Sequence, residues 1–285
     1  MEMNEFDTKE IVTWCPGCLN YAILNSTKKA FTNLVNKKTI KKENITIVTG
    51  IGCASKIFDY INVSGFYGLH GRVMPTAMGI KIGNPDLTVV GFAGDGDTYA
   101  EGIGHLVHTA RKNVNMTMIV HDNQIFALTT GQTTPTSTID DITKTSPFGV
   151  KDVPLNPIAF AIVCGATFVA RVSTLDLDYM TEVFEKAIEH KGFSFVEVFQ
   201  PCLIFHNNIQ YLNGKTYKLD KPLAFNDAIT KAYEWNYTKD EKAKIPIGIF
   251  YQTNRSTFED NLVNKGPWHT IKRNIDIKKI VEEYK

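Results

Sequence analysis

Two polar segments carry the residue types that bind a phosphate group and a metal ion. The first is the GDGD turn at residues 94–97. The second is the short polar segment that follows the next apolar run and contains Asn123. Glycines let the backbone approach phosphate oxygens and point N–H groups at them. A carboxylate beside a phosphate is repulsive unless a cation lies between them, and Mg²⁺ or Ca²⁺ accepts the oxygens that Asp95 and Asn123 offer. With a carbonyl near Ile125 as a third ligand, the pattern predicts a divalent cation that holds a diphosphate.

This acidic turn also has a purely structural interpretation. A glycine-rich turn can simply close a strand, with Asn123 capping the next element. The apolar runs before Asp95 and before Asn123 read as neighbouring strands, so both residues fall at the carboxyl edge of one sheet, where open α/β sheets bind ligands. That placement favours a binding site over the structural alternative.

Four of the five cysteines form a second candidate site. Cys15 and Cys18 form a CxxC motif, which brings two thiols close enough to share a metal or a cluster, or to act as a redox pair. Cys53 lies in a glycine-rich turn and Cys202 follows a predicted strand, so we expect both at the edge of the sheet that carries Asp95. Four thiolates suit a structural Zn²⁺ or a [4Fe–4S] cluster, and spacing alone does not separate these alternatives.

Three further polar residues lie where a ligand would be within reach. Lys56 closes the turn that contains Gly52 and Cys53, His70 stands between glycines that leave room for an anion, and Thr129 opens a run rich in hydroxyls and amides. Each also has a plain alternative. A loop lysine is often incidental, a loop histidine often bonds only to backbone groups, and a hydroxyl-rich loop is often mobile.

A parallel sheet must position these segments. Short apolar runs alternate with helix-compatible stretches, which predicts an α/β fold with a parallel sheet flanked by helices. The predicted strands span residues 45–49, 87–93, 116–120, 166–172, 193–199 and 246–251, and the predicted helices span residues 19–34, 76–82, 100–111, 156–163, 176–190, 223–235 and 275–284. Residues 128–157 show little periodicity, which is typical of functional or interface loops. We expect a binding domain at residues 1–202 and a C-terminal extension at residues 203–285 that wraps this domain or contacts a neighbouring subunit.

Composition and charge exclude several classes of protein. The chain has 31 basic and 30 acidic residues, which gives no reason to expect a nucleic-acid partner. No apolar stretch approaches the length of a membrane span, and the polar start lacks the apolar region of a signal peptide. We therefore expect a cytoplasmic protein without a membrane partner, whose cysteines serve metal binding or catalysis rather than disulfides. Cys164 lies in apolar surroundings and is expected to pack as a small hydrophobe.

Taken together, the motifs resemble those of one enzyme family. GDG followed by an asparagine is similar to the diphosphate-binding motif of thiamine enzymes, although that family often has NN where this chain has Asp122-Asn123. The segments WCPGC, GIGC, HGR, GDGD…N, TTGQ…PT and QPC resemble, in this order, the β subunits of 2-oxoacid:ferredoxin oxidoreductases. The resemblance covers roughly residues 10–260. That family frequently has Lys or Gly where Thr130 stands, which leaves the role of Thr130 open.

The resemblance implies a thiamine-diphosphate-binding fold and a set of ligands. Mg²⁺ would be held by Asp95, Asn123 and the Ile125 carbonyl. A [4Fe–4S] cluster would be held by Cys15, Cys18, Cys53 and Cys202. Catalytic roles would fall to Lys56 and His70. Contacts to the cofactor would come from Gly52, Cys53, His70, Gly94, Asp95, Gly96, Asp97, Asn123, Ile125, Leu128 and Thr129.

The implied activity is coenzyme A-dependent oxidative decarboxylation of a 2-oxoacid. The acid would be 2-oxoglutarate, pyruvate or a broad range, and the products acyl-CoA and CO₂, with electrons passing singly through the cluster to ferredoxin. A closed zinc site would do nothing for thiamine chemistry, whereas a cluster accepts its electrons. The pyrimidine-binding domain would lie on a separate α subunit, with γ and δ subunits as further candidates, so this chain alone is expected to be inactive. The residues of the segments WCPGC and HGRVMPTAMGIK resemble the 2-oxoglutarate-specific or broad-specificity branches of the family more than the pyruvate-specific enzymes.

Two other functions stay open on the residues alone. One is a subunit of a non-redox thiamine-dependent decarboxylase, whose cysteines bind zinc or nothing. The other is a zinc-stabilised nucleotide-binding module, in which the GDGD turn holds a magnesium–nucleotide complex. Iron–sulfur absorption would exclude the first, and binding of thiamine diphosphate would exclude the second.

Overall fold

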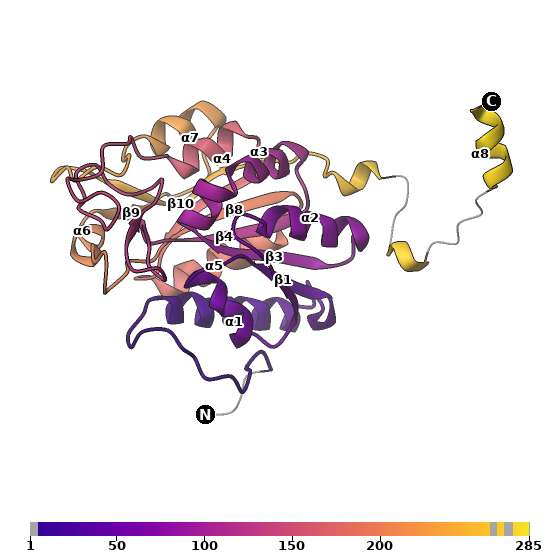
Figure 1. Ribbon diagram of the computed structural model, residues 1–285, viewed down its shortest axis with the longest axis horizontal. Helices are drawn as coiled ribbons and strands as arrows, with labels where there is room; N and C mark the ends of the chain where they lie inside the picture. The colour runs from indigo at the N-terminus through magenta and orange to yellow at the C-terminus, as the bar shows by residue number, and fades with distance from the viewer. Residues whose placement is uncertain (1–4, 263–266, 271–275, 285) are drawn as a thin grey trace.

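An eight-stranded sheet crosses the centre of the computed structural model, which describes residues 5–262, 267–270 and 276–284 (Figure 1). The strands follow the order β2-β1-β3-β4-β8-β7-β10-β9, and all neighbours are parallel except β7 and β10. They are β1 (Ile45–Thr49), β2 (Ser64–Tyr67), β3 (Thr88–Gly94), β4 (Met116–Asp122), β7 (Phe168–Ser173), β8 (Phe193–Phe199), β9 (Thr216–Lys218) and β10 (Ile245–Gln252). The carboxyl ends of the parallel strands β1, β2, β3, β4, β7 and β8 therefore meet at one edge of the sheet.

Helices cover both faces of this sheet (Figure 1). One face carries α1 (Asn20–Asn36) and α5 (Leu177–Glu189), which pack against each other over a shared core. The other face carries α2 (Val73–Gly83), α3 (Ile103–Lys112), α4 (Pro157–Val163) and α7 (Phe225–Ala232). The remaining elements are a β5–β6 hairpin (Ile125–Phe126 and Gln132–Thr133), a π-helical turn (Gly96–Glu101), α6 (Ile209–Asn213), α8 (Ile277–Glu283), and 3₁₀ turns at Lys42–Asn44, Ala54–Tyr60, Glu259–Asn261 and Trp268–Thr270. Among the described helices, none has the length and apolar character that a membrane span requires.

Local sequence explains where several of these elements begin. Strands β4 and β8 are buried at every position, as expected for the near-continuous apolar runs of parallel strands covered on both faces. Asn156 caps α4 by accepting a hydrogen bond from the Ala159 N–H, and Pro157 occupies the first turn, where its missing donor costs nothing. Asp176 caps α5 in the same way, accepting from the Tyr179 N–H at 3.1 Å.

The predicted parallel α/β fold is confirmed, with local differences. The helix predicted from residue 100 begins at Ile103, because the preceding residues form the π-helical turn that carries Asp97 inward. The helix predicted from residue 76 begins at Val73, since a proline is tolerated in a first helical turn. The helix predicted to Trp235 ends at Ala232. Residue 275, where the last predicted helix starts, lies outside the described residues.

Four short strands and one short α-helix of the described chain were not predicted. Strand β2 is exposed along its whole length, so it lacks the apolar alternation that marks a strand. Strand β5 lies just before the segment predicted to have little periodic structure, and β6 lies inside it. Helix α6 and strand β9 lie inside the polar stretch after residue 205. Each of these is too short to show a period in sequence.

A buried ion pair joins two central strands. The Nε of Arg171 on β7 lies 2.6 Å from Oε2 of Glu197 on β8, and both side chains are fully buried. Within the described part of the chain neither Nη atom of Arg171 has a hydrogen-bond partner. The guanidinium instead lies 5.0 to 5.9 Å from the rings of four aromatic residues, Phe199, Trp235, Tyr237 and Phe250. Two of these rings belong to the C-terminal extension outside the sheet, so the pair ties this extension to the central strands.

Removal of Arg171 alone should be strongly destabilising. Arg171→Leu leaves the Glu197 carboxylate buried without its counter-charge, which costs about 3–5 kcal/mol in the free energy of unfolding. Urea denaturation of the purified chain measures this loss. The double variant Arg171→Leu with Glu197→Gln should recover much of it, because the orphaned charge is gone. A loss below about 1 kcal/mol, the value of an exposed ion pair, would contradict this assignment.

Candidate cofactor and metal site

Sheet register brings the two predicted binding segments together. Gly94 pairs with His121, and Thr49 pairs with Phe92, so the loops after β1, β3 and β4 leave the sheet side by side. One cavity lies between them, and every predicted cofactor-contacting residue lines it. The lining residues are Ile51, Gly52, Cys53, Ala54, His70, Gly94, Asp95, Gly96, Asp97, Asn123, Ile125, Phe126, Ala127, Leu128 and Thr129.

Asp95 is a buried carboxylate that accepts hydroxyl hydrogen bonds and forms no ion pair with the basic side chains that the structure describes. Its side chain is 1% exposed, and the Thr136 hydroxyl lies 2.8 Å from its Oδ2. The same hydroxyl lies 3.0 Å from Oδ1 of Asp122, so Thr136 joins the two acidic residues. Burial raises the pKa of Asp95 to about 6, while hydrogen bonds from Thr134 and Thr136 act in the opposite direction.

A buried acidic network continues behind Asp95. The Tyr237 hydroxyl lies 2.7 Å from Oδ2 of Asp122 and 2.7 Å from Oε1 of Glu197. Burial and then the charges of Glu197 and Asp95 raise the pKa of Asp122 well above its ordinary value. Three carboxyl groups thus share one buried cation, Arg171, which lies at the far end of the network. A cation bound at Asp95 would offset this repulsion and favour the ionised forms of these carboxyl groups.

Asn123 and Ile125 form a tight turn beside Asp95. The Asn123 Oδ1 accepts a hydrogen bond from the Ile125 N–H at 3.1 Å. Gln124 between them has a φ of 62°, a left-handed conformation that non-glycine residues seldom adopt. Such unfavourable backbone conformations gather at ligand-binding sites, where surrounding contacts enforce them. Here the β5–β6 hairpin, in which Ile125 pairs with Thr133, holds the turn.

Asp97 lines the same cavity but its carboxylate holds two loops. Oδ2 accepts a hydrogen bond from the Ile51 N–H at 2.9 Å, and Oδ1 accepts one from the Gly71 N–H. The Nδ1 of His70 lies 3.7 Å from Asp97 Oδ1 and 3.7 Å from Glu101 Oε2. Asp97 therefore fixes the loop after β1 against the loop that carries His70.

Two glycines that line this cavity have different structural roles. A Cβ on Gly96 would collide with the ring of Phe126, so only glycine lets this turn pack under the β5–β6 hairpin. Gly52 has a φ of 108°, and a Cβ placed there would meet nothing within 4 Å. The Gly52 backbone therefore faces open space in the cavity, as a phosphate cradle requires.

The four predicted cluster ligands line a second cavity of about 210 Å³. Trp14 orients the CxxC loop, since its Nε1 donates a hydrogen bond to the Cys53 carbonyl at 2.7 Å. Burial, followed by the charges of Cys18 and Cys202, raises the pKa of Cys53 to about 11. The cavity lining comprises Thr13, Trp14, Cys15, Cys18, Asn20, Cys53, Lys56, Asn123, Ala127, Leu128, Thr130, Gln200, Cys202, Leu203, Ile204 and Phe205.

The thiols of Cys15, Cys18, Cys53 and Cys202 line the walls of a cavity and do not converge on a single position. Across residues 5–262, 267–270 and 276–284, no three His, Cys, Asp or Glu side chains are placed to hold one metal ion. Mutual repulsion of Cys15, Cys18 and Cys202 contributes to the raised pKa of Cys18, after burial. Four thiolates in this cavity therefore require positive charge among them. The fifth cysteine, Cys164, packs against the core of α3 and α4 as predicted.

The two cavities adjoin. Both are lined by Cys53, Asn123, Ala127 and Leu128, which form the wall between them. The two predicted catalytic residues fall on opposite sides of that wall. His70 lines the cofactor cavity, whereas Lys56 lines the cysteine cavity, where its Nζ lies 3.1 Å from the Thr13 hydroxyl.

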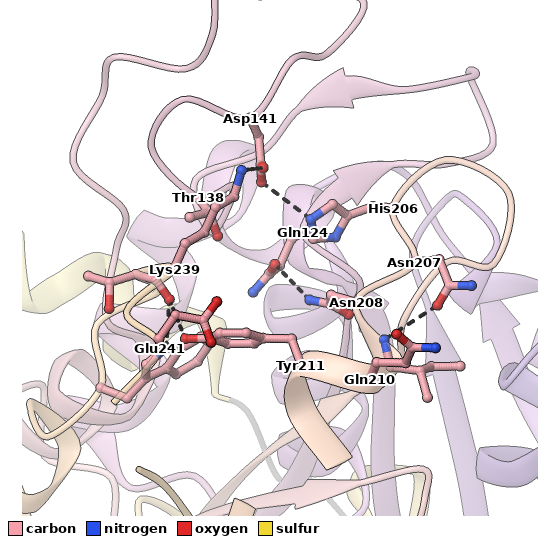
Figure 2. Close-up of a pocket in the computed structure, with 13 residues that line it drawn as sticks. Gln124, Thr138, Asp141, His206, Asn207, Asn208, Gln210, Tyr211, Lys239 and Glu241 are labelled. Carbon is pink, nitrogen blue, oxygen red and sulfur yellow. Dashed lines mark hydrogen bonds and ion pairs between the residues drawn. The ribbon is translucent and has the colours of Figure 1, made fainter. Parts of the chain in front are cut away.

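A third and larger cavity, of about 790 Å³, is lined in part by Gln124, the residue after Asn123 (Figure 2). His206 lies in its wall, with Nε2 3.3 Å from Asp141 Oδ2, and Lys239 pairs with the same aspartate at 2.6 Å (Figure 2). The His206 Nδ1 lies 3.3 Å from the Asn123 carbonyl oxygen. The segment after β8 thus contacts the Asn123 turn through His206.

Four supporting residues were not predicted: Thr136, Gln200, His206 and Tyr237. Thr136 is part of the PT pair and Gln200 part of QPC, so both lie within motifs that the sequence contains. His206 and Tyr237 come from the C-terminal extension, where the sequence shows no motif. Their contacts depend on how this extension folds back over the edge of the sheet.

Comparisons with known proteins agree with this geometry. Residues 50–198 match the family described as thiamine pyrophosphate enzyme, C-terminal TPP binding domain, and residues 205–265 match the C-terminal part of the pyruvate ferredoxin oxidoreductase β subunit. The 2-oxoacid:ferredoxin oxidoreductase β subunit of Saccharolobus solfataricus is 38% identical over 273 residues, which cover 89% of this chain and 86% of that protein. The 2-oxoglutarate oxidoreductase subunit KorB of Mycobacterium tuberculosis is 39% identical over 203 residues, which cover 71% of this chain and 53% of that protein.

A solved structure extends the similarity to the whole chain. It is a 2-oxoglutarate:ferredoxin oxidoreductase from Magnetococcus marinus with 2-oxoglutarate, coenzyme A and succinyl-CoA bound. The TM-score is 0.89 and the identity 31%, with 100% of this chain and 97% of that chain covered. The predicted resemblance is therefore confirmed, and the chain belongs to the family of 2-oxoacid:ferredoxin oxidoreductase β subunits.

Proposed function

We propose that this β subunit holds thiamine diphosphate, Mg²⁺ and a [4Fe–4S] cluster in its two adjoining cavities. With an α subunit it would convert a 2-oxoacid and coenzyme A to acyl-CoA and CO₂ and pass electrons to ferredoxin. The observation that carries the proposal is the shared wall of Cys53, Asn123, Ala127 and Leu128. Because the same four residues line both cavities, a thiamine diphosphate in one cavity and a cluster in the other would be separated by only one layer of residues.

The residues around Asp95 fit a magnesium–diphosphate complex. Mg²⁺ is usually bound by one or two carboxylates together with phosphates, rather than by a cage of protein side chains. The Asp95 carboxylate, the Asn123 amide oxygen and the Ile125 carbonyl oxygen supply such an incomplete set of oxygen ligands. A bound cation would also balance the charge of the three buried carboxyl groups. The backbone of Gly52 and the GDGD turn would then face the diphosphate.

The residues around the second cavity fit a cluster better than a single zinc ion. A zinc ion draws four ligands to one point, whereas a [4Fe–4S] cluster spaces its thiolates around a cube. Cys15, Cys18, Cys53 and Cys202 line a volume and do not converge on one point. Burial and the charges of neighbouring cysteines raise the pKa values of Cys18 and Cys53. The positive charge of bound iron would offset the repulsion between the thiolates.

When bound, thiamine diphosphate supplies the decarboxylation chemistry and the cluster supplies one-electron transfer. The chain's own residues orient and enclose these groups. Asp97 holds the loop of His70 beside the cofactor cavity, which leaves the imidazole 36% exposed for substrate contact. Lys56 provides a cation at the cysteine cavity, where its charge acts against burial and lowers the pKa of the Cys53 thiol.

The surroundings of the two cavities suit a partner subunit. Leu128, Ile204 and Phe205 of the cavity walls are large apolar residues that are exposed, and so are Phe66 and Leu69 in the segment before His70. We assign this surface to the α subunit, which would bring the pyrimidine-binding domain. Residues 1–202 would form the binding domain and residues 203–285 a subunit-contacting extension. A cytoplasmic location would keep the cluster thiols reduced.

Activity should require the α subunit. Because we assign the pyrimidine-binding domain to the α subunit, we expect 2-oxoacid- and coenzyme A-dependent ferredoxin reduction by the isolated chain to fall by at least about 100-fold relative to the co-expressed complex, the scale of losing correct placement of the reacting groups. An anaerobic assay with and without the α subunit measures this. Comparable turnover by the isolated chain would refute the division of the cofactor site between subunits.

A further inference from the structure

One side chain contacts residues of both proposed sites. Gln200 follows β8 directly, and its side chain lies between the Asn123 turn and the CxxC loop. Its Oε1 lies 3.4 Å from Asn123 Nδ2, and its Nε2 lies 3.9 Å from the Sγ of Cys18. The first contact reaches a proposed magnesium ligand, and the second reaches a proposed cluster ligand.

The backbone around Gln200 fixes this position. The Gln200 N–H donates to the Asp122 carbonyl at 2.8 Å, which continues the β4–β8 ladder by one residue. The residue is 2% exposed, so the amide does not exchange its partners for water. Nε2 also lies 3.4 Å from the Pro201 carbonyl oxygen. Nε2 therefore faces two acceptors, the Cys18 Sγ and the Pro201 carbonyl oxygen, and Oε1 faces the Asn123 Nδ2 donor. These contacts set the orientation of the Gln200 amide.

We infer that Gln200 is a positioning residue that sets the reduction potential of the cluster through its N–H···S contact with Cys18. This rests on the proposed function, because it requires a cluster on Cys18. A hydrogen bond to a cluster sulfur stabilises the more negative, reduced form and so raises the potential. The Asn123 contact keeps the amide turned toward Cys18, which links the magnesium turn to the cluster.

Two variants test this inference. Gln200→Met keeps the length of the side chain and removes the N–H donor, and Gln200→Glu keeps the shape and replaces the donor with a carboxylate. Both should retain the iron of the parent complex but be harder to reduce. We expect a change of about three- to tenfold in the reduction equilibrium, and tenfold is about 59 mV for one electron. The glutamate variant should show the larger decrease.

The measurement is a redox titration of the anaerobic complex, followed by electron paramagnetic resonance. Asn208→Leu is the matched control, because Asn208 makes an amide contact to Gln124 at 3.2 Å and touches no thiol of the cavity. Its potential should equal that of the parent. An unchanged or higher potential in the Gln200 variants would overturn the inference, and so would loss of iron from both. Absence of iron from the parent complex would instead refute the proposed function.

Discussion

Replacing Asp95 with asparagine should abolish turnover of the assembled enzyme. The substitution keeps the shape of the side chain and removes the only charge among the three proposed magnesium ligands. Changes in residues that merely support metal ligands cost 10–100-fold in affinity, so loss of this ligand should weaken binding of Mg²⁺ with thiamine diphosphate by more than about 100-fold. Calorimetric titration of the anaerobic complex measures the affinity, and the ferredoxin assay measures turnover.

The iron content provides an internal check on this variant. Asp95 lines only the cofactor cavity, so Asp95→Asn should keep the iron of the parent complex. Asp86→Asn, which changes an exposed acidic residue before β3, should behave like the parent in all three measurements. Unchanged binding of Mg²⁺ and thiamine diphosphate by Asp95→Asn would exclude Asp95 as a metal ligand.

Replacing Cys202 with serine should have the reverse effect. Cys202 lines the cysteine cavity but not the cofactor cavity, so the variant should lose iron while it still binds Mg²⁺ and thiamine diphosphate. Ferredoxin reduction should fall by more than about 100-fold, because a direct ligand matters more than a supporting residue. Iron analysis and the same calorimetric titration separate these two effects.

Cys164 is the matched control for Cys202. It is equally half-buried but packs among apolar side chains of α4, outside both cavities. Cys164→Ser should therefore keep its iron and its ferredoxin activity. Full iron content and activity in Cys202→Ser would show that the cluster has other ligands.

The part of the site that could be predicted from sequence is the part built at the ends of strands. Asp95 and Asn123 each follow an apolar run, and parallel pairing of β3 with β4 places such positions side by side. Cys53 and Cys202 likewise follow β1 and β8. In each case the residue type indicates the kind of ligand, and the preceding apolar run indicates a position at the end of a strand. Both features can be read from the local sequence.

The supporting residues could not be predicted in the same way. The contacts of Tyr237 with Asp122 and of His206 with Asn123 join segments that are far apart in sequence. No local period or spacing encodes such pairs, because they depend on the path of the C-terminal extension. The π-helical turn at Gly96–Glu101 was missed for a related reason, since it is stabilised by the bonds of Asp97 to distant backbone groups.

The most direct test of the account is to co-express the chain with its α subunit, purify the complex without oxygen, and measure iron, sulfide and visible absorption. We expect about four irons and four sulfides per β subunit if the other subunits carry no cluster. The absorption should bleach when a 2-oxoacid and coenzyme A are added together. Zinc in place of iron, or an iron absorption that these substrates leave unchanged, would contradict the proposal that the two cavities form one electron-transfer site.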